Sequence, residues 1–288
     1  MNCVGLHVPK QSRPQYWVTD RRLVAHTSRC LESTRSKLMG ENDNISMPEA
    51  IRNLGVHCKR QGRLKEAEEM YKLGLKKHEK ATDRDSFTIE TLNNLGNLFL
   101  FQDRLEEAVE SYQQAMDKSE ETLPQDHPLL FRTVNHLGVC FLQRGKLAEA
   151  KCMLERALEG RERTLGPNDL STLDTAHNLG ELYSKQGKNA EAENMLLWAL
   201  EGRERELEVG HILTLETVSN LGNFYSCQEK PDKAEEMFSR ALKGFEGAFG
   251  RNHISTRITA KKLGLLLARQ GELDRAEEMF SWALEGHK

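Results

Sequence analysis

A Leu-Gly pair recurs through most of the chain at a nearly constant interval. It occurs six times, and the intervals between successive glycines are 41, 42, 42, 42 and 42 residues. The six glycines are Gly55, Gly96, Gly138, Gly180, Gly222 and Gly264. A period of this length is typical of proteins in which each repeat is one supersecondary unit that packs on its neighbours. We therefore predict a tandem array rather than a single globular core.

Each repeat carries the pattern of two amphipathic helices. Around each Leu-Gly, apolar residues stand four and one before the glycine and three after it, which is one stripe of an α-helix. A turn follows seven residues after the glycine, usually at a second Gly that suits a left-handed helix end. The second helix has Ala twelve residues after the Leu-Gly glycine, then an aromatic residue or Leu, then another small residue. The small residues let two helices approach closely.

This order of residues resembles the tetratricopeptide repeat over residues 46–288. The common form of that repeat has a period of about 34 residues. Here the additional residues lie in a longer second helix, seen in Leu158–Arg163 and its copy Leu200–Arg205, and in the loop that follows. A 42-residue period resembles the kinesin light chain type. The resemblance implies an all-α, right-handed α-solenoid of six helix-turn-helix repeats.

The predicted domain organisation has a basic N-terminal segment followed by the repeats. The segment covers residues 1–45 and carries seven Lys or Arg against two acidic residues in its first forty. Apolar residues every seven positions predict an N-terminal helix over about 16–38 that caps the first repeat; a basic arm or organelle transit peptide is the alternative. The run from Tyr16 to Leu31 also resembles the joint that precedes such repeats in fungal NTPase–repeat receptors. The predicted repeats are 46–84, 85–126, 127–168, 169–210, 211–252 and 253–288.

Charge and motifs argue against several function classes. A net charge of −3 gives no general attraction to nucleic acid, and no run of about 18 apolar residues predicts a membrane span. Six scattered cysteines without a C-x-x-C pair indicate a reduced, cytoplasmic protein. Gly180, Gly187 and Lys188 have the wrong spacing for a phosphate-binding loop. We therefore expect no catalysis, no cofactor and neither a nucleic-acid nor a membrane partner.

Histidines recur at one loop position of the repeats. His127, His211 and His253 are equivalent, and Asp169 takes the same place in another repeat. Equivalent positions in stacked repeats are a whole repeat apart, so these rings cannot share a metal ion. Their substitution by Asp instead predicts that they cap the N-terminus of the first helix.

A polar face opposite the apolar stripe is the predicted binding site. It comprises the residues six and two before each Leu-Gly glycine and one and five after it. Four of the six repeats place Asn two before the glycine, where its amide can donate and accept hydrogen bonds to a peptide backbone. The alternative is that Asn is only a tolerated polar residue on a solvated face, but a helix interior otherwise disfavours Asn, which favours the binding role. By resemblance to the family, this face is the concave groove. The predicted peptide-binding residues are Asn53, Glu90, Asn94, Asn97, Arg132, Asn178, Glu216, Asn220, Asn223 and Lys262.

The sequence as a whole predicts a non-enzymatic scaffold that binds a partner protein or peptide in this groove. The alternative is the C-terminal sensor or oligomerisation module of an NLR-like signalling NTPase whose nucleotide-binding domain is absent from this chain. No polar capping helix follows the sixth repeat, so Phe280, Trp282 and Leu284 are expected to be partly exposed. Because solenoid ends need a polar cap for solubility, we predict one of two alternatives: the chain is a fragment of a longer array, or it self-associates through this end.

Overall fold

The computed structural model describes residues 47–78, 85–207 and 210–285. Within these ranges the chain forms twelve α-helices and no strand. The helices are α3 (Met47–Arg60), α4 (Leu64–His78), α5 (Asp85–Phe101), α6 (Leu105–Thr122), α7 (Pro128–Gln143), α8 (Leu147–Leu165), α9 (Leu170–Lys185), α10 (Asn189–Glu206), α11 (Ile212–Cys227), α12 (Pro231–Phe249), α13 (Ile254–Gln270) and α14 (Leu273–Glu285). The N-terminal helix predicted at 16–38 lies outside the described residues.

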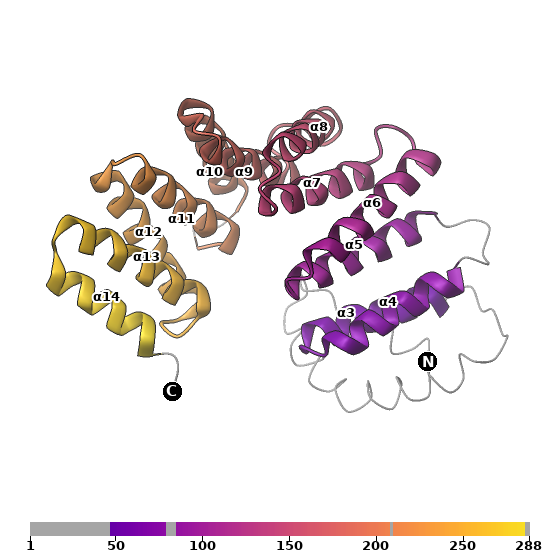
Figure 1. Cartoon of the computed structure of the whole chain (residues 1–288), viewed down its shortest axis with the longest axis horizontal. Helices are drawn as coiled ribbons and strands as arrows, with labels where there is room; N and C mark the ends of the chain where they lie inside the picture. Colours follow the sequence, from indigo (N-terminus) through magenta and orange to yellow (C-terminus); the bar gives the residue numbers. More distant parts are fainter. Residues whose placement is uncertain (1–46, 79–84, 208–209, 286–288) are drawn as a thin grey trace. The chain divides into compact units, whose positions relative to one another are not determined.

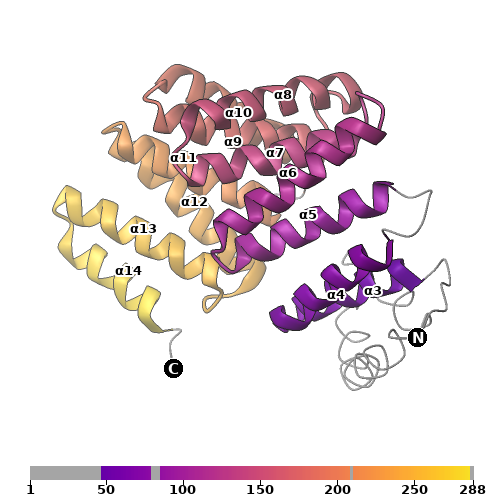
Figure 2. The same cartoon turned by 45° about the vertical axis from the view of Figure 1, so that its right-hand side comes forward.

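The chain divides into two compact parts, an N-terminal part of residues 1–140 and a C-terminal part of residues 141–288. The boundary falls inside α7. Within the parts, the first helix of a repeat packs against its second helix: α3 on α4, α5 on α6, α9 on α10, α11 on α12 and α13 on α14 (Figures 1 and 2). Second helices also pack on the next first helix, as α10 does on α11 and α12 on α13. The predicted all-α solenoid of tandem helix pairs is confirmed.

The Leu-Gly glycine is a point of close approach between the two helices of a pair. A Cβ atom built on Gly96 would lie 2.7 Å from the ring of Tyr112, and one on Gly222 would lie 2.7 Å from the ring of Phe238. Both rings are buried. The glycine and the large residue of the second helix therefore form one packing unit, because the missing side chain makes room for the ring.

Left-handed residues close the turns between the two helices of a pair. Gly62, Gly145, Gly187 and Gly271 have φ of 73°, 72°, 72° and 82°. In the second and fifth repeats the position is occupied by Asp103 and Glu229, with φ of 57° and 54°. A residue with a side chain is strained at positive φ. These two turns therefore keep the left-handed conformation although Asp and Glu disfavour it.

The loop histidines cap helices, as predicted. The Nδ1 atoms of His127 and His211 accept hydrogen bonds from the backbone N–H of Leu129 and Leu213, at 3.2 Å each. His253 accepts in the same way from Ser255 at 3.3 Å, and the carboxylate of Asp169 accepts from Ser171 at 2.8 Å. Each side chain thus satisfies an N–H group that the helix start leaves without a partner.

Two buried arginines join successive repeats in the C-terminal part. Arg203 on α10 donates to the carbonyl of Leu213 at 3.0 Å and to Oγ1 of Thr217 at 2.6 Å, both on α11. It also pairs with Asp174 on α9 at 3.1 Å. Arg161, one repeat earlier, donates in the same way to the carbonyl of Ser171 at 2.5 Å and to Thr175 at 2.7 Å. Burial lowers the pKa of Arg203, and the charge of Asp174 opposes this.

Candidate functional site

The ten predicted site residues stand on the first helices of the repeats. We call the outward surface of α3, α5 and α7 in the N-terminal part, and of α9, α11 and α13 in the C-terminal part, the first-helix face. The N-terminal part carries Asn53, Glu90, Asn94, Asn97 and Arg132, and the C-terminal part carries Asn178, Glu216, Asn220, Asn223 and Lys262. All are half-buried except Glu216, which is exposed.

The first-helix face of the N-terminal part holds a charged group around Glu90. Arg52 on α3 forms an ion pair with the Glu90 carboxylate on α5, and its guanidinium lies 5.2 Å from the ring centre of Phe87. Burial lowers the pKa of Arg132, and the negative charge of Glu90 opposes this. Asn53 and Asn94 make no side-chain hydrogen bond within the described residues.

Internal hydrogen bonds tie other polar residues of this part to its core. The hydroxyl of Tyr112 donates to Oδ1 of Asn97 at 2.8 Å, so the acceptor of Asn97 is already engaged. Asn93, which the sequence pattern did not single out, is buried and donates to Thr133 at 2.8 Å. Its oxygen lies 3.2 Å from Nδ1 of His136. These bonds fix the spacing of α5 and α7 beneath the face.

Asn220 occupies the centre of the polar network in the C-terminal part. Its Nδ2 lies 3.0 Å from Nε2 of His177 and donates to the carboxylate of Glu181, both on α9. Nδ2 of Asn223 donates to Oδ1 of Asn220 at 3.4 Å. Burial, which raises the pKa of Glu181, is outweighed by its bond to His177 and by nearby positive charges, so this pKa is lowered. Asn220 therefore holds two first helices together as well as facing outward.

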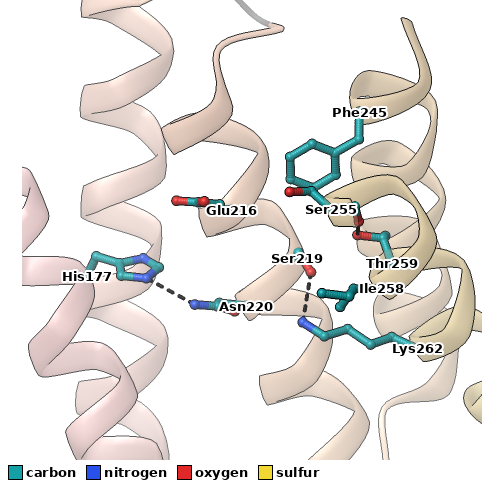
Figure 3. Close-up of a pocket in the computed structure, with 9 residues that line it drawn as sticks. All are labelled: His177, Glu216, Ser219, Asn220, Phe245, Ser255, Ile258, Thr259 and Lys262. Atoms are coloured by element: carbon teal, nitrogen blue, oxygen red, sulfur yellow. Dashed lines mark hydrogen bonds between the residues drawn. The ribbon is translucent and has the colours of Figure 1, made fainter. Parts of the chain in front are cut away.

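Three of the predicted residues line one hollow between α11 and α13. Glu216, Asn220 and Lys262 meet there around a volume of about 260 Å³. Figure 3 shows all nine lining residues; the others are His177, Ser219, Phe245, Ser255, Ile258 and Thr259. Seven of the nine lining residues are polar, and the apolar surface comes from the buried Phe245 on α12 and the exposed Ile258 on α13. The hollow thus offers both apolar surface and several hydrogen-bonding groups to a ligand.

Two opposite charges line this hollow without neutralising each other. Nζ of Lys262 donates to Oγ of Ser219 at 3.1 Å, and burial lowers its pKa. The Glu216 carboxylate forms no ion pair or hydrogen bond within the described residues. Although the residue as a whole is exposed, the surrounding helices partly desolvate its carboxylate and raise the pKa of Glu216; the charges of His177 and Arg203 oppose this, and those of Asp174 and Glu181 add to it. Both charged groups are therefore available to a ligand.

Sequence reasoning missed several residues of the hollow. Phe245 follows the core spacing of second helices, and Ser255 and Thr259 stand at the start of a first helix, outside the four positions used to define the face. A signal existed in the comparison of repeats: Phe245 stands 42 residues after the buried Arg203, so repeat five departs from repeat four at this position.

The remaining described side chains offer no metal centre. No group of three or more His, Cys, Asp or Glu side chains in the described ranges is placed to hold an ion. Cys58 and Cys140 are buried free thiols, whereas Cys152 and Cys227 are exposed free thiols. Burial raises the pKa of Cys58 to about 11, which keeps this thiol neutral.

Within the described ranges, none of the helices has the length and apolar character that crossing a bilayer requires.

The last helix pair exposes an apolar edge, as predicted. Leu284 on α14 is 68% exposed, whereas its equivalent in repeat five, Leu242, is 7% exposed beneath α13. Ile254 and Ile258 on α13 are also exposed, and Phe280 and Trp282 are half-buried. A hollow of about 390 Å³ lies along this edge, with Arg257 and Lys261 beside the apolar groups.

Comparisons with known proteins agree with this architecture. The family model described as tetratricopeptide repeat matches residues 46–121, 87–163, 129–205 and 213–288. Among solved structures, BtubC (BKLC) from P. vanneervenii has a TM-score of 0.66 and 24% identity, covering 80% of this chain and 92% of its own. Nearly identical kinesin light chain TPR-like repeats from Podosopora anserina have a TM-score of 0.59 and 20% identity, covering 70% and 95%. These similarities support the kinesin light chain-like type of repeat.

A third similar structure contains a bound partner. It is a Rap protein in complex with Competence and Sporulation Factor, with a TM-score of 0.68 and 17% identity, covering 92% of this chain and 71% of that one. A comparison with curated protein sequences found no match.

Proposed function

The chain belongs to the tetratricopeptide repeat family, and we propose that it is a non-enzymatic scaffold that binds a peptide or helical segment of a partner protein on its first-helix face. The observation that carries this proposal is the hollow of the C-terminal part. Glu216, Asn220 and Lys262 meet there from two successive first helices. Such convergence of a few polar groups beside apolar side chains, here Phe245 and Ile258, is a feature of ligand sites.

The internal hydrogen bonds of the face support binding by a preformed surface. Asn220 is held by His177 and Glu181, and Asn97 is held by Tyr112. Side chains that are already ordered lose little conformational entropy when a ligand binds, so more of each contact contributes to affinity. The Rap protein, which has a similar fold, is bound to Competence and Sporulation Factor in its crystal structure, and this is consistent with a peptide partner here. The free thiols support a cytoplasmic location.

The first prediction concerns the asparagines of the face. Peptides selected from a random library against the full chain should bind with an affinity that falls roughly fivefold in Asn94→Ala or in Asn220→Ala, because each amide contributes about 1 kcal/mol of hydrogen bonding. Matched controls are Gln114→Ala on α6 and Asn194→Ala on α10, which are exposed on second helices. Fluorescence anisotropy of the labelled peptides gives the dissociation constants.

These measurements show whether the ligand binds the first helices or the second helices of the repeats. Unchanged affinity in both face variants, together with loss in a control variant, would place the ligand on the second helices and overturn the proposal. Asn94→Ala should leave thermal unfolding nearly unchanged, since the amide has no internal partner among the described residues. The NLR-like alternative stays a prediction.

The exposed apolar edge favours self-association as a second candidate activity. The equivalent edge of repeat five is covered by a first helix, and we propose that a second copy of the chain covers the edge of α13 and α14. Arg257 and Lys261 on α13 line this edge. Glu277 on α14 is exposed and stands two helical turns before Leu284, on the same side of that helix. The edge therefore carries both signs of charge, which suits a two-fold contact with itself.

Substitution of the most exposed apolar residue tests this contact. Leu284→Glu should convert a dimer or larger species into a monomer in light scattering at micromolar concentration, because the contact would bury an unpaired carboxylate. The control is Glu278→Gln, which changes a charge on the exposed surface of the same helix. A wild-type chain that is monomeric at every concentration measured contradicts self-association.

A further inference from the structure

The buried arginine that joins repeats three to four and four to five is missing at the junction of repeats five and six. Arg161 and Arg203 each donate to a backbone carbonyl and to a Thr hydroxyl in the following first helix. Phe245 stands at the equivalent position, 42 residues after Arg203. Its ring is buried, so this junction is packed without a guanidinium group.

The groups that accept hydrogen bonds from the arginine are nevertheless retained. The carbonyl of Leu213, Thr217 and Asp174 bind Arg203. The residues 42 positions later are Ser255, Thr259 and Glu216. All three line the hollow, together with Phe245 (Figure 3). Thr259 donates to the Ser255 carbonyl at 2.8 Å, as Thr217 does to Leu213 at 2.9 Å, so the local geometry is conserved between these two junctions.

The charge of Glu216 is left without the cation that its equivalent has. Asp174 is neutralised by Arg203, whereas Glu216 has no ion-pair partner within the described residues. In Figure 3 its carboxylate is turned toward His177 on α9. Because the side chain is exposed and forms no hydrogen bond, it can turn back toward the hollow without breaking one.

We propose that the hollow is a subsite for an arginine side chain of the partner, whose guanidinium replaces the missing repeat arginine between Glu216, Ser255 and Thr259. The inference rests on the proposed function and names the residue that the partner presents. A planar guanidinium suits a carboxylate combined with a carbonyl and a hydroxyl, since its five N–H groups point in several fixed directions. The ring of Phe245 adds a surface on which the cation can lie.

Lys262 lines the same hollow, and it suggests the rival interpretation that the ligand is an anion. Its ammonium donates to Ser219 and feels the negative charge of Glu181. A ligand that pairs with the Lys262 ammonium carries a carboxylate, whereas a ligand that pairs with the Glu216 carboxylate carries a cation. The two interpretations predict opposite effects of removing the lysine charge, because Lys262 repels a cationic ligand and attracts an anionic one.

The test measures small probes on the full chain. N-acetyl-arginine amide, its neutral isostere N-acetyl-citrulline amide and N-acetyl-glutamate amide are titrated while the methyl signal of Ile258 is followed by NMR, with the buried Ile89 of the N-terminal part as an internal control. We expect the arginine probe to shift Ile258 saturably and to bind at least tenfold more tightly than citrulline, because the charge-assisted bond to Glu216 is lost in citrulline.

Four variants sharpen the result. Glu216→Gln should weaken the arginine probe about tenfold, and Lys262→Met should strengthen it. Phe245→Arg should abolish binding by filling the hollow from within, whereas Gly247→Arg adds the same charge at an exposed position of the same helix, where a side chain meets nothing, and should not. Equal binding of arginine and citrulline, no effect of Glu216→Gln, or preference for the glutamate probe with loss in Lys262→Met would each overturn the subsite. The probe titration contains no partner peptide, so a failure of the arginine subsite can be told apart from a failure of peptide binding in the asparagine variants.

Discussion

Arg203→Ala is expected to lower the free energy of unfolding of the C-terminal part by about 2–3 kcal/mol. The Arg203 side chain is 2% exposed. It joins three helices, because it lies on α10 and bonds Asp174 on α9 and Leu213 and Thr217 on α11. Truncation leaves a cavity and removes the donors to three acceptors. The estimate is reduced because Asp174 is partly exposed, so water can solvate its carboxylate once the arginine is gone.

The matched control for this prediction is Arg205→Ala on the same helix. Arg205 is exposed and donates to the carbonyl of Glu201 in its own helix at 3.1 Å, so its loss should change stability by less than about 0.5 kcal/mol. Urea unfolding and hydrogen exchange of peptides from α9 to α11 measure both variants. Equal, small effects of the two substitutions would mean that the buried arginine contributes little to the junction.

The fold was predictable because its signals are local and are repeated six times. The Leu-Gly pairs, the turn glycines and the loop histidines each act within one helix pair, as the contact of Gly222 with Phe238 and the cap at His211 show. Six copies of a weak pattern also average out single departures, such as Asp103 and Glu229 at positions where Gly is usual. Helical repeats therefore reveal their architecture through the period alone.

The site was only partly predictable, because its contacts join different repeats. The sequence placed Asn220 on the outward face but did not show that His177, 43 residues earlier, holds its amide. The hollow depends on what repeat five lacks rather than on a motif it contains. Phe245 is an ordinary core residue by its spacing, and only the comparison with Arg203 and its bonded partners shows what has changed.

Ala192→Leu is expected to destabilise the fourth repeat by about 1–3 kcal/mol through overpacking. Ala192 on α10 is fully buried in a core shared with Leu196 and Leu221, at the position where every repeat has an alanine. The control is Ala190→Leu, two residues earlier on the same helix and exposed, where the added methyl groups meet solvent. The difference between the two variants isolates the cost of filling the space between the helices.

The distribution of the damage tests the one-dimensional nature of the array. Each repeat contacts mainly its neighbours, so loss of hydrogen-exchange protection in Ala192→Leu should be largest in α9 to α11 and absent from α3 and α5. A globular core would transmit the strain throughout and lower protection evenly. Uniform loss in both parts of the chain would show that the repeats unfold as one cooperative unit. The bonds of Arg203 would then contribute to the stability of all the repeats rather than to one junction alone.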